Sequence, residues 1–202
     1  MASGEFERDE VELFLRQIQP CAACIDIGAN IGLYSCLAAS RSKQVIAFEP
    51  LPENHRYLFK NLADNGLFDI EVYPVGLSSR PGLKRIYGSG AVASFLPAWH
   101  AATATRFAVV PVTTLDIVIA ARFDGVPITI KMDVEGFEFE VLKGSERTLR
   151  LHPAPAWLVE IQLARDAAGG LNDRFYETFE IFWRQGYQSA VADAKQHPVL
   201  PM

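Results

Sequence analysis

A glycine-containing turn is the part of this chain best suited to bind a small charged molecule. It follows a short apolar run directly and comprises seven residues: Asp26-Ile27-Gly28-Ala29-Asn30-Ile31-Gly32. Its glycines would let the backbone approach a ligand closely, and the helix expected after it offers free N–H groups. Asp26 could meet a cationic amino group while the turn amides meet a carboxylate. The turn therefore suits the amino-acid end of a ligand such as methionine, which carries both charges.

An acid at the end of the next apolar run could complete this site. Glu49 follows Gly28 by 21 residues, close to the spacing at which an acid holds ribose hydroxyls. A carboxylate suits that position because it can accept from two hydroxyls at once. The alternative ligand is a nicotinamide or flavin dinucleotide, which favours G-x-G-x-x-G. This turn has Ala29 and Asn30 between its only two glycines, which counts against a dinucleotide.

Three further acids could converge beside this turn. Asp133 and Glu135 follow an apolar run, and Glu160 lies in the next one. Together they could serve as a general base, as ligands for a divalent cation or as acceptors for sugar hydroxyls. Alternatively, Asp133 and Glu135 are helix-opening acids favoured by the helix dipole. We predict no metal site, although a divalent cation would be compatible with these side chains. Lys131 is expected to point away and to be structural.

Residues 78–105 separate two of the expected strands and are rich in glycine, alanine and serine. This connection is longer than usual, and long connections in small domains often form lids or substrate-binding loops. His100 could act there as a base. Trp99 could stack on a ring, but we favour a role in attaching the segment to the core.

The elements that must position these residues alternate between strand and helix. Apolar and β-branched runs predict strands at 24–27, 45–48, 70–75, 106–112, 127–132 and 157–163. Helical spacing and capping residues predict helices over 5–19 and 137–150, and others beginning near Leu33, Pro52 and Asn172. Residues 187–192 and the last few residues predict a closing hairpin. This alternation indicates an α/β fold with a mostly parallel sheet and helices on both faces.

Composition and charge restrict the class of protein. We expect one domain over residues 21–202, preceded by a helical segment over 1–20 whose first residues could be an added remnant. The net charge of −5 and the lack of a basic run argue against nucleic-acid binding. No apolar run approaches the roughly 18–20 residues that span a bilayer, and the acidic N-terminus is unlike a signal peptide. Three cysteines, an odd number, favour a reducing, cytoplasmic location.

Several motifs resemble those of the FkbM-type methyltransferases and occur in that family's order. They are DIGANIG at 26–32, AFEPLPEN at 47–54, TLD at 114–116, IKMDVEGFEFEVLKG at 130–144 and LVEI at 158–161. The resemblance extends from about Cys24 to Gln162, and the KMDVEG phrase is its most specific part. It implies a Rossmann-like class I fold with a seven-stranded sheet and S-adenosyl-L-methionine as the methyl donor.

The same resemblance implies roles for individual residues. The methionine and ribose end of the donor would be held by Asp26, Gly28, Ala29, Asn30 and Gly32. Glu49 and Pro50 would border the ribose, and Asp133 would lie at the donor as well as the acceptor. The adenine would be bordered by Gly76, Leu77 and Ser78.

The acceptor is expected to be a hydroxyl of a sugar, a glycan or a natural-product small molecule. Methyltransferases that act on base amino groups usually carry an Asn/Asp-Pro-Pro-aromatic turn, whereas this chain has Asp133-Val134-Glu135-Gly136. Removing a hydroxyl proton needs a base, for which Asp133, Glu135, Glu160 and His100 are the candidates. The alternatives are a non-catalytic module that binds the donor and a dinucleotide-dependent oxidoreductase. The acceptor's identity and the oligomeric state stay open.

Overall fold

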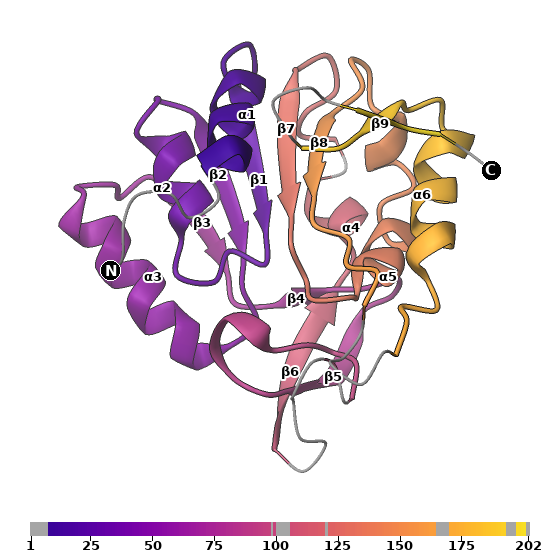
Figure 1. The fold of residues 1–202 in the computed structure, drawn as a ribbon. Helices are drawn as coiled ribbons and strands as arrows, with labels where there is room; N and C mark the ends of the chain where they lie inside the picture. The colour runs from indigo at the N-terminus through magenta and orange to yellow at the C-terminus, as the bar shows by residue number, and fades with distance from the viewer. Residues whose placement is uncertain are drawn as a thin grey trace.

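The computed structural model describes residues 8–97, 99, 106–119, 121–164, 170–192 and 197–200. Its main sheet has five parallel strands in the order β3-β2-β1-β7-β8 (Figure 1). These strands are β1 (Ala23–Ile27), β2 (Gln44–Phe48), β3 (Ile70–Tyr73), β7 (Ile128–Met132) and β8 (Ala156–Val159). The predicted α/β fold with a mostly parallel sheet is confirmed.

The two central strands, β1 and β7, have mostly apolar sequences, and each of their residues is buried. Such burial is typical of parallel strands that are covered on both faces. From β1 the chain proceeds outward to β2 and β3 and then returns to place β7 on the other side of β1. Ligands of open α/β sheets bind beyond the carboxyl ends of the strands at this reversal of order. The topology therefore locates a binding site where β1 and β7 end.

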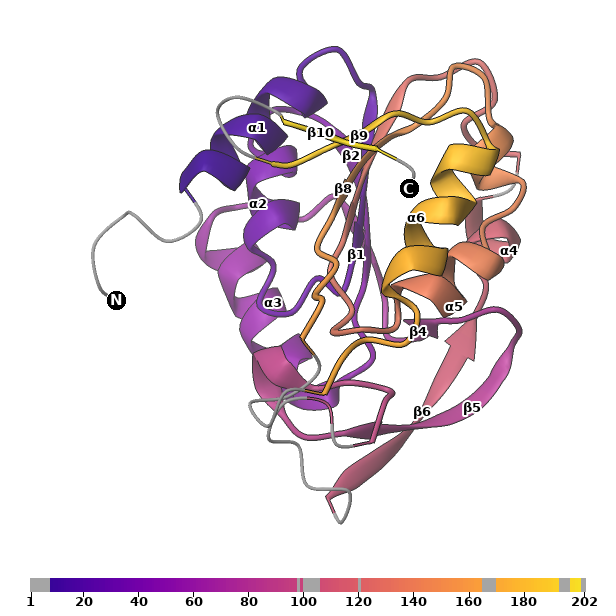
Figure 2. The same cartoon turned by 45° about the vertical axis from the view of Figure 1, so that its right-hand side comes forward.

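Helices cover both faces of the main sheet, as predicted (Figure 2). One face carries α1 (Arg8–Ile18), α2 (Leu33–Ala39) and α3 (Pro52–Asp64), and the other carries α4 (Leu115–Ile119), α5 (Glu138–Lys143) and α6 (Phe175–Arg184). In α3, proline occupies the first turn, where its missing N–H costs nothing. Leu58 and Leu62, one turn apart, are its buried apolar residues. Within the described ranges, no helix has the length and apolarity to cross a membrane.

The main sheet has five described strands instead of the expected seven. The closing hairpin is present, since β9 (Ser189–Ala190) pairs antiparallel with β10 (Pro198–Val199). Neither strand joins the main sheet in the described part of the chain, and with two residues each they offer few backbone groups for pairing. β8 is therefore the edge strand there, and it borders a hollow lined also by α1, α6 and β9.

The segment 78–105 is more regular than its composition suggests. β5 (Gly82–Tyr87) pairs antiparallel with β6 (Phe107–Thr113), and β4 (Gly76–Leu77) runs parallel to the far end of β6. A short 3-10 turn (Gly90–Val92) follows β5. These strands form a second sheet beyond the carboxyl ends of the main one (Figure 1). The long connection expected over 78–105 thus contains a strand, β5, that the residue patterns did not predict, and residues 98 and 100–105 lie outside the described residues.

A buried ion pair attaches α1 to the centre of the main sheet. Lys131 of β7 is 2% exposed, and its Nζ lies 3.0 Å from Oε1 of Glu10. Tyr34 donates a hydrogen bond to the same oxygen, and its ring centre lies 4.9 Å from the ammonium. Burial opposes the charged form of Lys131, but Asp133, Glu10 and Glu160 raise its pKa above the usual value. These contacts agree with the structural role expected for Lys131.

Replacing Glu10 by glutamine should destabilise the protein, because it leaves the Lys131 ammonium buried without its partner charge. We expect the free energy of unfolding to fall by roughly 2 kcal/mol, less than for a fully buried pair because Glu10 is partly exposed. Urea unfolding followed by circular dichroism would measure the change. Glu12→Gln on the same helix is the control, since Glu12 forms only an exposed pair with Arg8. Equal effects of both changes would contradict the assignment.

Candidate functional site

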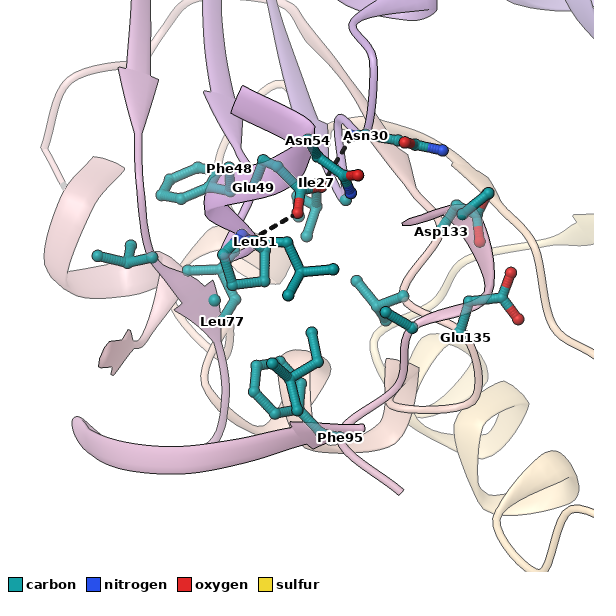
Figure 3. Close-up of a pocket in the computed structure, with 18 of the residues that line it drawn as sticks. Ile27, Asn30, Phe48, Glu49, Leu51, Asn54, Leu77, Phe95, Asp133 and Glu135 are labelled. Atoms are coloured by element: carbon teal, nitrogen blue, oxygen red, sulfur yellow. Dashed lines mark hydrogen bonds between the residues drawn. The ribbon is translucent and has the colours of Figure 1, made fainter. Parts of the chain in front are cut away.

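A pocket lies where the sheet topology predicts a ligand, beyond the carboxyl ends of β1, β2 and β7 (Figure 3). The Glu49 carboxylate lies on one side of it, and the Asp133 and Glu135 side chains come from the opposite side. Eight of the predicted site residues line it: Gly28, Asn30, Glu49, Pro50, Gly76, Leu77, Asp133 and Glu135. The structure therefore brings the glycine turn, Glu49, Asp133 and Glu135 to one place, whereas Glu160 does not line the pocket.

The turn after β1 is shaped by its contact with the end of β7. Gly28 has a φ of 81°, and a Cβ atom there would lie 1.8 Å from the Asp133 carbonyl oxygen. Only glycine fits this position. The amides of Gly28 and Ala29 both donate to the Phe48 carbonyl, and the amide of Gly32 donates to Ala29. These N–H groups are therefore engaged within the protein, which differs from the expectation that they meet a ligand carboxylate.

Glu49 is held firmly at the start of the loop that follows β2. Its Oε2 accepts from the amide of Asn30 at 2.9 Å, and its Oε1 accepts from the amide of Leu51 at 2.8 Å. The residue is 4% exposed, and burial raises the pKa of its carboxyl despite these hydrogen bonds. A carboxylate has about four acceptor sites, so further lone pairs stay available to a ligand's hydroxyls.

Four predicted cofactor residues do not line the pocket. Asp26 lies on the opposite face of β1 from Ile27 because side chains alternate along a strand, and its carboxylate accepts from the Ser35 hydroxyl at 2.5 Å. Burial raises the pKa of Asp26 above its usual value. The other three do not line it either: Ala29 and Ser78 are buried, and Gly32 lies at the start of α2.

The predicted acceptor acids lie in a group around Asp133. Burial raises the pKa of Asp133 to about 7, Lys131 opposes this effect, and the negative charges of Glu160, Glu135 and Glu138 add to it. Glu160 directly follows β8, and its carboxylate accepts from Gln162 at 3.0 Å. The described residues offer no group of side chains that could hold a metal ion. His100 lies outside the described residues.

The sequence reasoning missed an acid beside this group. Glu138 is 1% exposed, and its Oε1 accepts from the Gly136 amide at 3.0 Å. Burial raises its pKa to about 7 although backbone hydrogen bonds lower it. Its position in the first turn of the helix after KMDVEG was a signal that could have identified it.

A mostly apolar part of the pocket lining was also missed. Leu51 and Asn54 come from the AFEPLPEN phrase, whereas Ile86 and Phe95 come from the segment 78–105. The Phe95 ring packs against Phe137, with 5.0 Å between the ring centres. Nothing in the sequence distinguished Phe95 from the other aromatic residues of its segment, because its contacts join residues distant in the chain.

Comparisons with known proteins agree with this architecture. The family model described as "Methyltransferase FkbM domain" matches residues 26–189. The curated hexuronic acid methyltransferase AglP of Haloferax volcanii is 28% identical over 144 residues. That alignment covers 71% of this chain and 58% of AglP, so the chain spans less than two-thirds of this relative.

Two solved structures share the fold at low sequence identity. The precorrin-6y C5,15-methyltransferase of Geobacter metallireducens has a TM-score of 0.51 and 14% identity, covering 95% of this chain and 80% of that one. The bifunctional kinase-methyltransferase WbdD also has a TM-score of 0.51 and 14% identity, covering 94% of this chain and 36% of that one. The fold supports the family match, which extends over most of the chain: this chain belongs to the FkbM methyltransferase family.

Proposed function

We propose that this protein transfers the methyl group of S-adenosyl-L-methionine to a hydroxyl of a sugar, a glycan or a natural-product small molecule. The observation that carries the proposal is the position of Glu49 and Asp133 in one pocket at the β1–β7 switch point. A methyl donor with a ribose needs an acid for its hydroxyls, and a hydroxyl acceptor needs a base. The pocket offers one carboxylate for each of these two roles.

The lining of the pocket fits the donor. Glu49 is fixed by two backbone amides and keeps lone pairs for the ribose hydroxyls. Leu77 and Phe95 offer an apolar surface for a flat heterocycle, and the turn at Gly28 and Asn30 would border the methionine end. When bound, the donor supplies a methyl group activated by a positively charged sulfur. The chain's own residues bind the donor, orient the acceptor and accept a proton.

Asp133 is our candidate for the general base. A base works best when its pKa lies near the working pH, and the pKa of this carboxyl is raised to about 7. Within the described residues no hydrogen bond is made to its carboxylate, which is therefore available to an acceptor. The relative that modifies hexuronic acid supports a sugar as the acceptor class. We also propose a cytoplasmic location, because the three cysteines are free.

Replacing Glu49 by glutamine should weaken donor binding, because the ribose loses a charged acceptor. Hydrogen bonds to a charged group contribute about 1.5–3 kcal/mol, so we expect roughly 10- to 100-fold weaker binding of S-adenosylhomocysteine. Isothermal titration calorimetry would measure it. The control is Glu146→Gln, which changes an exposed acid and should leave affinity unaltered. Binding of NADH in place of S-adenosylhomocysteine would favour the oxidoreductase alternative.

Replacing Asp133 by asparagine should stop catalysis while preserving donor binding. We expect methyl transfer to fall by roughly 10²- to 10⁴-fold, the usual contribution of a general base, with S-adenosylhomocysteine affinity changed by less than about threefold. The assay follows the labelled methyl group into a panel of hexoses and hexuronic acids. An active wild-type protein whose Asp133→Asn variant keeps its full rate would exclude Asp133 as the base. A wild-type protein that binds the donor but methylates nothing supports the non-catalytic alternative.

The same carboxyl predicts how the rate depends on pH. With a pKa raised to about 7, Asp133 is protonated below that pH and cannot accept the acceptor's proton. The wild-type rate should therefore fall as pH decreases through about 7, and not near the usual aspartate value of about 3.9. Initial rates between pH 5 and 9 at saturating donor would test this. A rate that stays constant down to pH 5 would contradict the assignment.

A further inference from the structure

The turn between β7 and α5 is held from one side by the segment that follows β5. Glu135 has a φ of 52°, which is unfavourable for a residue with a side chain. The Ser94 hydroxyl donates to its carbonyl at 2.6 Å, and the Trp99 Nε1–H donates to its Oε2 at 3.1 Å. Two residues of one segment thus hold both the backbone and the side chain of Glu135.

The Trp99 indole packs closely against the turn. Trp99 is 0% exposed, and a Cβ on Gly136 would lie 2.3–2.5 Å from three of its ring atoms. The ring therefore lies directly over the Gly136 backbone. This contact makes Trp99 more than an attachment of the segment to the core, because its polar atom meets an acid of the acceptor site.

The side-chain amide of Gln162 contacts two of the acids, Glu160 and Glu135. Gln162 Nε2 donates to Glu160 Oε1 at 3.0 Å and lies 3.5 Å from Glu135 Oε2. The backbone carbonyl of Gln162 accepts a hydrogen bond from the Asn172 side chain at 3.0 Å. Gln162 therefore connects the loop after β8 with the turn after β7.

These N–H groups fix where two acids lie relative to Asp133. Trp99 donates to Glu135, and Gln162 donates to Glu160 and lies within hydrogen-bond distance of Glu135. The charged groups that act on Asp133 from its surroundings are Lys131, Glu160, Glu135 and Glu138. Three of these four are acids, which oppose ionisation of Asp133 when they are themselves charged.

We propose that Trp99 and Gln162 are positioning residues of the acceptor site, which hold the Glu135 and Glu160 side chains in place beside Asp133 and leave Asp133 as the group that accepts the proton. The inference rests on the proposed function, since it assigns the base of that reaction. It also gives the acids different roles, because Glu135 and Glu160 accept hydrogen bonds within the protein whereas Asp133 is open to the acceptor.

Two substitutions remove these N–H groups while keeping side-chain bulk. Trp99→Phe leaves an aromatic ring over Gly136 but no N–H for Glu135. Gln162→Leu removes the amide from a different element, so it tests the inference should Trp99→Phe fail to fold. Trp183→Phe is the matched control, because the Trp183 Nε1 is buried and has no hydrogen-bond partner within the described structure. Near-ultraviolet circular dichroism would verify that each variant is folded.

The decisive measurement is the titration of Asp133 by NMR in protein labelled with ¹³C at side-chain carboxyl groups. Its signal is assigned by its loss in Asp133→Asn. In wild type we expect a midpoint of about 7, and in Trp99→Phe or Gln162→Leu a midpoint lower by about one pH unit, since a carboxylate that is no longer held beside Asp133 raises its pKa less. Trp183→Phe should titrate as the wild type does.

Unchanged midpoints in both variants, or an equal shift in Trp183→Phe, would overturn the inference. Calorimetry with S-adenosylhomocysteine separates this outcome from failure of the proposed function. Affinity should be unchanged in both variants, because neither side chain lines the donor pocket. If the wild-type protein does not bind S-adenosylhomocysteine, the proposed function fails, and the titration still reports whether Trp99 and Gln162 control Asp133.

Discussion

The whole site depends on how closely the ends of β1 and β7 approach each other. The Asp133 amide donates to the Ile27 carbonyl at 3.0 Å, so pairing continues one residue past the strands. This brings the Asp133 carbonyl against Gly28, where any side chain would collide with it. A single close backbone contact thereby unites two segments that lie about a hundred residues apart. The glycine turn and Asp133 share one edge of the sheet for this reason.

Lys131 and Asp133, two residues apart, carry opposite charges and have different surroundings. Lys131 points from β7 toward α1, where Glu10 and Tyr34 hold its ammonium. Asp133, two residues later, lies past the end of the strand and lines the pocket. Lys131 still lowers the pKa of Asp133, but burial and neighbouring acids outweigh it. The strand thus supports a stabilising ion pair on one face and, at its end, a carboxyl that can exchange a proton near neutral pH.

Residue patterns predicted the strands of the main sheet well, because buried parallel strands form continuous apolar runs that any window along the chain reveals. They did not reveal β5, which lies in a glycine-rich region. Its side chains differ in exposure along the strand: Leu83 is exposed and Ile86 is buried. β5 exists because it pairs with β6 twenty residues later, and such pairing leaves no local signal. The seven-stranded sheet was implied by the family resemblance, whereas the β9–β10 hairpin, which residue patterns predicted, does not join the main sheet in the described part of the chain.

Local sequence was sufficient to select the glycine turn, Glu49 and Asp133, which line one pocket, because each directly follows an apolar run that forms a strand of the main sheet. It could not tell which side chains face the pocket: Asp26 carries the right charge but lies on the far face of β1. Nor could it foresee that the turn amides donate to the Phe48 carbonyl, that Phe95 lines the pocket or that Trp99 donates a hydrogen bond to Glu135. Each of these depends on contacts between distant segments, and burial and charge environment arise only when those segments pack together.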